Sequence, residues 1–187
     1  TIIAGGKANQ TTVLENGVQN VRDGIATDNI ISGQQNVNGG TANNNTIEDG
    51  GKQIITEGGQ ANQTMVEKGG EQHVTDGIAT TNTINAGGLQ NIEHQGIAQD
   101  NNISGTQNVA GGTANNNTLY NGGVQNVSQG GQANTNVINN GGIQNVNAGG
   151  TATDNKIDVG GVQNVNAQGT ANNNVVSGTQ NVSGGMA

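Results

Sequence analysis

The hydrophobic positions along this chain are few and regularly spaced. They stand singly among Gly, Asn, Gln and Thr, and the same arrangement returns every 16 to 19 residues. In residues 112–130 the recurring positions are Ala114, Leu119, Gln125 and Val127. Ala follows an opening Gly by two residues, an aliphatic residue follows Ala by five, and a Gly-containing turn leads to a Gln-x-aliphatic triplet. Self-similarity at a fixed period predicts a repeat protein.

The pattern occurs ten times, and the units differ in length. They open at Gly6, Gly24, Gly40, Gly59, Gly77, Gly96, Gly112, Gly131, Gly150 and Gly169. Units 24–39, 96–111 and 169–184 have only 16 residues, because the turn after the first aliphatic position shrinks to Ser-Gly. We expect these short units to pinch the coil or interrupt a strand, giving a dent at every fourth unit. Partial units at both ends suggest cuts through a longer array.

The segments between the turns favour strands. They are too short for helices, Gly and Asn are poor helix formers, and Val and Ile favour strands. In the triplet, Gln125 and Val127 share one face, while Val124 and Asn126 face the other way. One such segment has too little apolar surface to be stable alone, but identical segments stacked in register cover one another. The sequence therefore predicts an all-β fold, a single-stranded parallel β-helix (solenoid) with about ten coils of 16–19 residues. We expect a right-handed coil and one array over residues 1–187, without an internal domain boundary.

Recurrent amides are expected to supplement the small apolar core. Stacked amides can form hydrogen-bonded ladders along the axis of a cross-β stack. We expect a Gln column and an Asn/Thr column to point inward or line the turns, and a second Asn column to point outward. The Gln column comprises Gln19, Gln35, Gln53, Gln72, Gln90, Gln107, Gln125, Gln144, Gln163 and Gln180. The Asn/Thr column comprises Thr11, Asn29, Asn45, Thr64, Asn82, Asn101, Asn117, Asn136, Asn155 and Asn174. The outward column comprises Asn20, Asn36, Asn91, Asn108, Asn126, Asn145, Asn164 and Asn181, interrupted only by Ile54 and His73.

Composition narrows the range of functions. Only 29% of the 187 residues are hydrophobic, 34 are Gly, and the net charge is -8 with five basic residues. So few cations argue against nucleic acid as a partner. The absence of Cys rules out a disulfide framework. No signal peptide or long apolar run is present, so a signal for export would lie outside this sequence.

No catalytic, cofactor or metal site is expected. His73 and His94 lack a second ligand at metal-binding spacing, and the acidic residues do not form the calcium-binding nonapeptide of β-rolls. Tyr120 is the only aromatic residue, so an aromatic sugar platform is missing. The Thr row needed for ice binding is interrupted at most units. We therefore expect a protein that is not an enzyme.

The runs GGTANNNTLYNGGVQNV (111–127) and GGQANTNVINNGGIQNV (130–146) resemble the passenger repeats of AIDA-type self-associating autotransporters. The resemblance extends over the whole chain and includes unit length, Gly pairs, Ala, Gln and Val in register. It implies a right-handed β-helix exported via the periplasm to the bacterial cell surface by an outer-membrane β-barrel translocator lying outside this sequence. It also implies autoaggregation, biofilm formation, host-cell adhesion and cytoplasmic O-heptosylation of Ser and Thr before export.

The resemblance suggests particular glycan acceptors. The family often has Ser before the Gly pair of the first turn, and only the short units of this chain keep Ser there. We expect these three Ser first and four outward Thr after them, although turn hydroxyls also serve backbone hydrogen bonding alone. The candidates are Ser32, Ser104, Ser177, Thr12, Thr46, Thr83 and Thr118.

The leading hypothesis is a glycosylated surface adhesin passenger. Its expected partners are an O-heptosyltransferase, copies of itself on neighbouring cells and the host-cell surface. Two alternatives remain open. One is a carbohydrate-binding or carbohydrate-cleaving β-helix similar to a phage tailspike, and the other is an inert spacer stalk.

Overall fold

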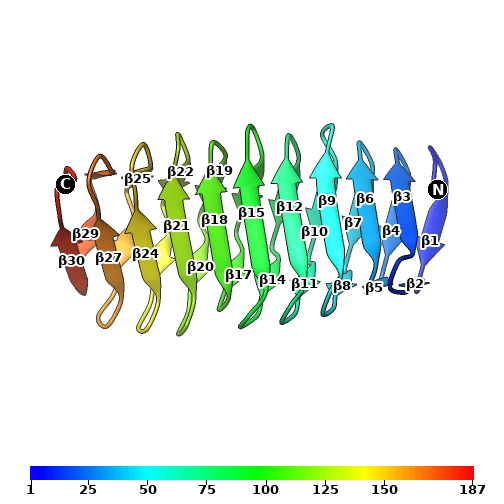
Figure 1. Ribbon diagram of the computed structural model, residues 1–187, viewed down its shortest axis with the longest axis horizontal. Coiled ribbons are helices and arrows are strands. Elements are labelled where there is room, and N and C mark those ends of the chain that lie inside the picture. The colour runs from blue at the N-terminus through cyan, green and yellow to red at the C-terminus, as the bar shows by residue number, and fades with distance from the viewer.

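The computed structural model describes residues 1–187 as a rod of ten stacked coils, with the two termini at opposite ends (Figure 1). Each coil contributes three strands, and every strand pairs in parallel with its equivalent in the next coil. The result is three ten-stranded sheets running the length of the rod, as the repeat pattern predicts. None of the chain forms a helix with the length and apolarity needed to cross a bilayer. The coils are numbered 1 to 10 in chain order below.

The three sheets are named here by the residue that each one turns inward. The Ala sheet consists of β1 (Lys7–Asn9), β4 (Ile25–Thr27), β7 (Thr41–Asn43), β10 (Gln60–Asn62), β13 (Ile78–Thr80), β16 (Ile97–Gln99), β19 (Thr113–Asn115), β22 (Gln132–Asn134), β25 (Thr151–Thr153) and β28 (Thr170–Asn172). The aliphatic sheet consists of β2 (Thr12–Val13), β5 (Ile30–Ile31), β8 (Thr46–Ile47), β11 (Met65–Val66), β14 (Thr83–Ile84), β17 (Asn102–Ile103), β20 (Thr118–Leu119), β23 (Val137–Ile138), β26 (Lys156–Ile157) and β29 (Val175–Val176). The Gln sheet consists of β3 (Val18–Arg22), β6 (Gln34–Asn38), β9 (Lys52–Thr56), β12 (Glu71–Thr75), β15 (Leu89–Glu93), β18 (Thr106–Ala110), β21 (Val124–Ser128), β24 (Ile143–Val146), β27 (Val162–Val165) and β30 (Thr179–Val182).

The register places like residues above one another. Val109 is paired with Val127, and Val127 with Val146, so these three valines form one column. Ala114 is likewise paired with Ala133 on the Ala sheet. The predicted architecture of identical, self-covering coils is therefore confirmed.

The apolar core consists of two separate clusters of buried side chains. One cluster of 12 buried residues joins the Val and Ile side chains of the Gln sheet to the alanines of the Ala sheet. A second cluster of 7 buried residues runs along the aliphatic sheet from Ile47 to Ile157. Buried Gln and Asn side chains are also part of the interior. The small Ala side chain allows the first cluster to be thin, so the coil is narrow.

The corner between the Ala sheet and the aliphatic sheet has the same backbone in every coil. One non-Gly residue there adopts a positive φ of 52–57° in all ten coils, for example Asn44 and Asn116. Its N–H donates to a carbonyl of the next coil, as Asn116 N–H does to Asn134 O at 3.0 Å. Asn and Asp tolerate this left-handed conformation better than most residues, whereas the β-branched Thr81 and Thr135 are unusual there.

The opening Gly of a unit is required by the close approach of backbone stacked beneath it. A Cβ on Gly131, where coil 7 passes into coil 8, would lie 2.1 Å from Val109 O of strand β18 in coil 6. Any side chain at this position would force neighbouring coils apart.

The short coils keep all three strands, so the expected interruption of a strand does not occur. Coil 2, for example, retains β4, β5 and β6, and it is shorter than the 19-residue coils because its turns contain fewer residues. The expected dents are present. Recesses of about 330 and 370 Å³ lie where short coils 2 and 6 turn from the Gln sheet to the Ala sheet, beside Gly39 and Gly111. A third recess, of about 450 Å³, lies over the shortened turn at Ser32 and Gly33.

Candidate functional site

The buried Gln column forms a continuous hydrogen-bonded ladder. In all nine junctions between coils, the side-chain amide of one Gln donates to the side-chain oxygen of the Gln below, at 2.6–2.7 Å. Gln125, for example, donates to Gln107 and accepts from Gln144. These side chains are fully buried in the middle of the rod, where a partner is needed to offset the loss of hydration. The predicted amide ladder is confirmed here.

The buried Asn/Thr column points inward as expected, but its hydrogen bonds differ from the expected ladder. Its Asn Oδ1 atoms accept from the backbone N–H of the equivalent residue in the coil below, as Asn136 Oδ1 does from Asn117 N–H at 2.7 Å. Most Nδ2 groups donate to a Gln oxygen or to a backbone carbonyl instead of to one another, as Asn82 does to Gln72 and Asn155 to Ala133. The Nδ2 group of Asn101 is buried without a partner. The corner backbone leaves an N–H without a strand partner, and the side chain one coil above satisfies it.

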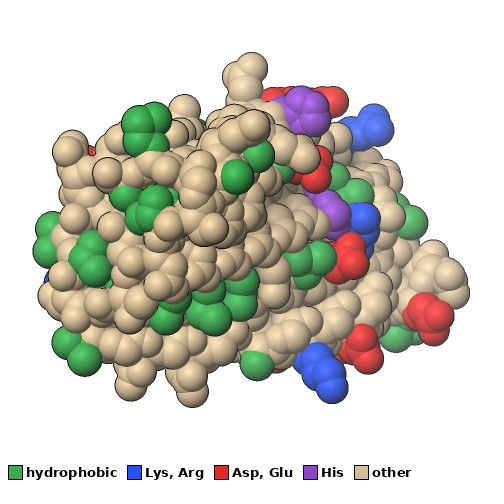
Figure 2. All heavy atoms as spheres, turned by 60° about the vertical axis from the view of Figure 1, so that its left-hand side comes forward, with side chains coloured by type: hydrophobic (Ala, Val, Ile, Leu, Met, Phe, Trp, Pro, Cys, Tyr) green, Lys and Arg blue, Asp and Glu red, His purple; other side chains and the backbone are tan.

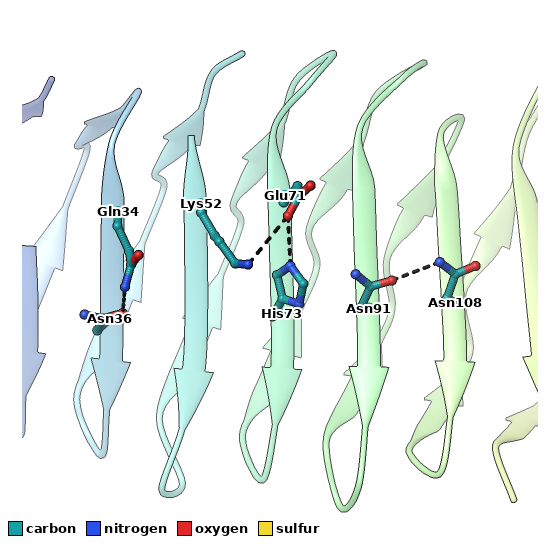
Figure 3. Close-up of polar contacts among 7 residues, drawn as sticks. All are labelled: Gln34, Asn36, Lys52, Glu71, His73, Asn91 and Asn108. Atoms are coloured by element: carbon teal, nitrogen blue, oxygen red, sulfur yellow. Dashed lines mark hydrogen bonds and ion pairs between the residues drawn. The ribbon is translucent and has the colours of Figure 1, made fainter. Parts of the chain in front are cut away.

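The outward Asn column on the Gln sheet forms a second ladder in two parts. Asn36 donates to Asn20, and the second part runs without a gap from Asn91 to Asn181, with bonds of 2.7–2.9 Å. Figure 3 shows the bond between Asn91 and Asn108 on adjacent strands. An amide offers two donors and two acceptor lone pairs, and a ladder uses one of each. Every inner rung therefore keeps hydrogen-bonding capacity that faces outward.

An ionic cluster occupies the gap between the two parts of this ladder. His73 Nε2 lies 3.0 Å from Glu71 Oε2, and Lys52 Nζ of the coil below lies 3.7 Å from the same oxygen (Figure 3). The hydrogen bond from His73 lowers the pKa of the Glu71 carboxyl below its usual value; partial burial opposes this shift, and the positive charge of Lys52 adds to it. The cluster is a surface feature, as expected for His73, and it holds too few ligands for a metal.

His94 lies apart from this cluster. It is an exposed turn residue with a φ of 51°, and it borders one of the recesses beside Glu93 and Gln129. No group of three or more His, Cys, Asp or Glu side chains in the rod could hold a metal ion.

All seven hydroxyl candidates lie on one side of the rod. Thr12, Thr46, Thr83 and Thr118 are the outward residues of strands β2, β8, β14 and β20 in the aliphatic sheet. The three serines follow strands β5, β17 and β29 of the same sheet. Thr12 and Ser177 are exposed, and the other five are half-buried.

Ser32 differs from the other two serines in having a charged partner. Its Oγ donates to Glu48 Oε2 in the next coil at 2.8 Å, beside the recess over its shortened turn.

A further row of hydroxyls was not among the sequence-derived candidates. Four outward Thr precede the inward Ala on the Ala sheet, and all are half-buried. They are Thr41, Thr113, Thr151 and Thr170. The signal was present in the sequence, because the period of two turns both neighbours of a buried Ala outward.

Charge is distributed unevenly along the rod. Residues 1–100 hold eleven of the thirteen acidic and four of the five basic residues, a formal charge of -7, which leaves -1 for residues 101–187. Residues 101–153 contain no Asp, Glu, Lys, Arg or His. In Figure 2, charged side chains gather on the right of the view, whereas the left is mostly polar and uncharged with scattered hydrophobic groups. The longer part of the outward Asn ladder therefore lies largely on a neutral surface.

Comparison with known proteins agrees with this architecture. A family model described as the adhesin of the bacterial autotransporter system, probable stalk, matches residues 31–88. Among solved structures, the chain is similar to a crystal structure of a TibC-catalysed, hyper-glycosylated fragment of TibA. The two share 31% sequence identity and a TM-score of 0.78 over 98% of this chain and 78% of that one. A search of curated proteins found no match. This stalk-like β-solenoid thus belongs to the AIDA-type family of bacterial autotransporter adhesins, whose members are exported to the cell surface.

Proposed function

We propose that the chain is a glycosylated, non-enzymatic passenger that mediates bacterial autoaggregation, biofilm formation and adhesion to host cells. The observation that carries this proposal is the likeness to a glycosylated TibA fragment, which extends over 98% of the chain at 31% identity. The narrow rod suits display on a surface, since buried apolar side chains fill its interior from coil 2 to coil 9.

The proposed modification is O-heptosylation in the cytoplasm, before export, by a heptosyltransferase. The TibA fragment supports an enzymatic modification of such a rod, because its own hyper-glycosylation is catalysed by TibC. The aliphatic sheet supplies acceptors that a glycosyltransferase could use without disturbing the core, because their hydroxyls point away from the buried column. We propose Ser32, Ser104 and Ser177 first, followed by Thr12, Thr46, Thr83 and Thr118.

The proposed self-association uses the outward Asn ladder of the Gln sheet. Each rung offers a spare donor and a spare acceptor at the ~4.8 Å spacing of the coils. A second copy of the rod presents the same spacing, so many weak amide contacts can form together and sum by multivalency. The neutral stretch at residues 101–153 places no charged side chains of its own between two such faces.

Clumping of cells that display the chain tests this proposal. The triple variant Asn108→Ala, Asn126→Ala, Asn145→Ala removes three consecutive rungs from the neutral part of the ladder. A matched variant, Asn115→Ala with Asn134→Ala, removes a hydrogen-bonded amide pair from the Ala sheet instead. We expect clumping to fall at least about tenfold for the first variant, because multivalent contacts are lost together, and to persist for the second. Equal clumping by all three strains at equal surface display would contradict the proposal and favour a spacer stalk.

A further inference from the structure

One junction between coils lacks a hydrogen bond that all the others have. In eight of the nine junctions, an Asn Oδ1 of the upper coil accepts from a buried backbone N–H of the lower coil at 2.7–2.8 Å. The exception lies between coil 3 (residues 40–58) and coil 4 (residues 59–76), where the upper residue is Thr64. The shorter Thr side chain does not replace the amide.

Both polar groups at this position are left without partners. Asn45 N–H donates no hydrogen bond, although the side chain of Asn45 is buried. Thr64 Oγ1 is buried and has no partner either. A buried polar group without a partner loses its hydration without compensation, so this junction is less stable than its neighbours.

The outward ladder is also missing here, within a gap that covers three junctions, from Asn36 of coil 2 to Asn91 of coil 5. Ile54 of coil 3 and His73 of coil 4 stand where other coils have Asn, so no amide bond joins them. The junction keeps its backbone pairing and the bonds of Gln72 to Gln53 and Asn62 to Asn43. The two apolar clusters also continue across it, as Ile55 with Val74 and Ile47 with Val66. Its other polar side-chain contact is the Lys52–Glu71 ion pair, whose side chains are 39% and 44% exposed. Exposed pairs of this kind contribute little to stability.

We propose that the junction between coils 3 and 4 is a built-in break point, at which the rod opens first into coils 1–3 and coils 4–10. In a solenoid each coil contacts only its neighbours, so stability is close to a sum of junction terms, and opening concentrates at the weakest junction. The break is independent of any glycan or binding partner. Under heat or mechanical load, coils 1–3 would separate from coils 4–10 before either part unfolds.

Hydrogen exchange followed by mass spectrometry on the whole chain tests the proposal. Met65 N–H and Glu71 N–H donate across the weak junction, and Val137 N–H and Ile143 N–H are their equivalents across the junction between coils 7 and 8. We expect exchange at the first pair to be roughly tenfold faster than at the second, as for a sub-global opening.

Three substitutions in the Asn/Thr column distinguish opening at this one junction from flexibility of the whole rod. Thr64→Asn supplies the missing acceptor and is expected to slow exchange at this junction by roughly tenfold. Thr11→Asn makes the same chemical change in coil 1, where no equivalent residue lies below, and is expected to change nothing there. Asn136→Thr removes the bond from Asn117 N–H and is expected to create a second fast-exchanging junction between coils 7 and 8.

The outcomes are decisive in either direction. Faster exchange at the junction between coils 3 and 4, slowed by Thr64→Asn alone, supports the break point. The proposal is overturned if amides at this junction exchange as slowly as those at other interior junctions. It is also overturned if Thr64→Asn leaves their exchange rate unchanged. A variant that does not fold would show as global loss of protection, and the wild-type comparison between the two junctions would then still decide.

Discussion

At the scale of single residues, stability depends on whether a side chain meets its own kind in the next coil. Gln125 and Asn126 are neighbours in the sequence, and both form ladder bonds. Gln125 is fully buried, whereas Asn126 is half-buried on the outer face. The same chemical bond therefore has different consequences at the two positions, because only the buried amide lacks water as an alternative partner.

Replacing Gln125 by Ala is expected to lower the free energy of unfolding by about 3–5 kcal/mol. The change leaves a cavity, the side-chain oxygen of Gln107 without a donor and the amide of Gln144 without an acceptor. Asn126→Ala is the matched control and should cost less than about 1 kcal/mol, since water replaces the lost partner. Denaturant unfolding followed by circular dichroism measures the free energy of unfolding of both variants. Similar losses of stability would contradict a larger contribution from the buried ladder than from the outward one.

The Glu71 carboxyl predicts a small dependence of stability on pH. Its pKa is lowered in the fold, so the ionised form is favoured there and contributes stability above the unfolded pKa that is lost as pH falls through the folded pKa. Glu71→Gln should therefore lower the melting temperature at neutral pH and converge with the wild type in strong acid. Glu15→Gln, at an exposed residue outside any ion pair, is the control. A difference between wild type and Glu71→Gln that stayed constant over this pH range would rule out the ionised carboxyl as its source.

At the scale of elements, most of the fold could be predicted from the sequence, because spacing alone sets the register when every unit pairs with its copy. The Ala, aliphatic, Gln and outward Asn columns follow from counting residues, and so do the breaks at Ile54 and His73. The partners of the buried Asn column could not be predicted. They depend on the left-handed corner residue, such as Asn116, which turns the following N–H away from the sheets.

The candidate site was predictable only in part. The aliphatic-sheet hydroxyls lie together as their spacing implies, but the spacing of Thr113 and Thr151 also places them outward on another sheet. Which hydroxyls an enzyme modifies depends on its own recognition of the chain, and the strand pattern does not encode this. The seven acceptors therefore stay predictions.

Neighbouring glycines of one turn are expected to differ in their tolerance of a side chain. A Cβ on Gly131 would lie 2.1 Å from Val109 O, whereas a Cβ on Gly130 meets nothing within 4 Å, although its φ of +84° disfavours a side chain. Gly131→Ala should destabilise the rod by roughly 3 kcal/mol or more, and Gly130→Ala by about 1 kcal/mol. Thermal unfolding of the two variants distinguishes a clash between coils from backbone strain, and the reverse order would refute the stated packing.

At the scale of the whole molecule, the rod is negatively charged along one half and nearly neutral along the other. Two copies of a chain with a net charge of -8 repel one another at low ionic strength. Contacts made by the neutral amide face do not depend on opposite charges.

Salt is therefore expected to strengthen self-association. Raising ionic strength screens the repulsion between rods but leaves amide hydrogen bonds in place. Sedimentation of the purified chain at low and high salt measures this effect. Dissociation on addition of salt would indicate that rods associate through ion pairs, contrary to the proposed neutral face.

The account of this chain as a glycosylated adhesin passenger is tested most directly by the intact mass of the protein isolated from its native host. We predict masses above that of the unmodified polypeptide, in steps of about 192 Da for each heptose residue. Peptide mapping should place these additions on the outward hydroxyls of the aliphatic sheet, starting with the three serines. A single species at the unmodified mass would contradict the account.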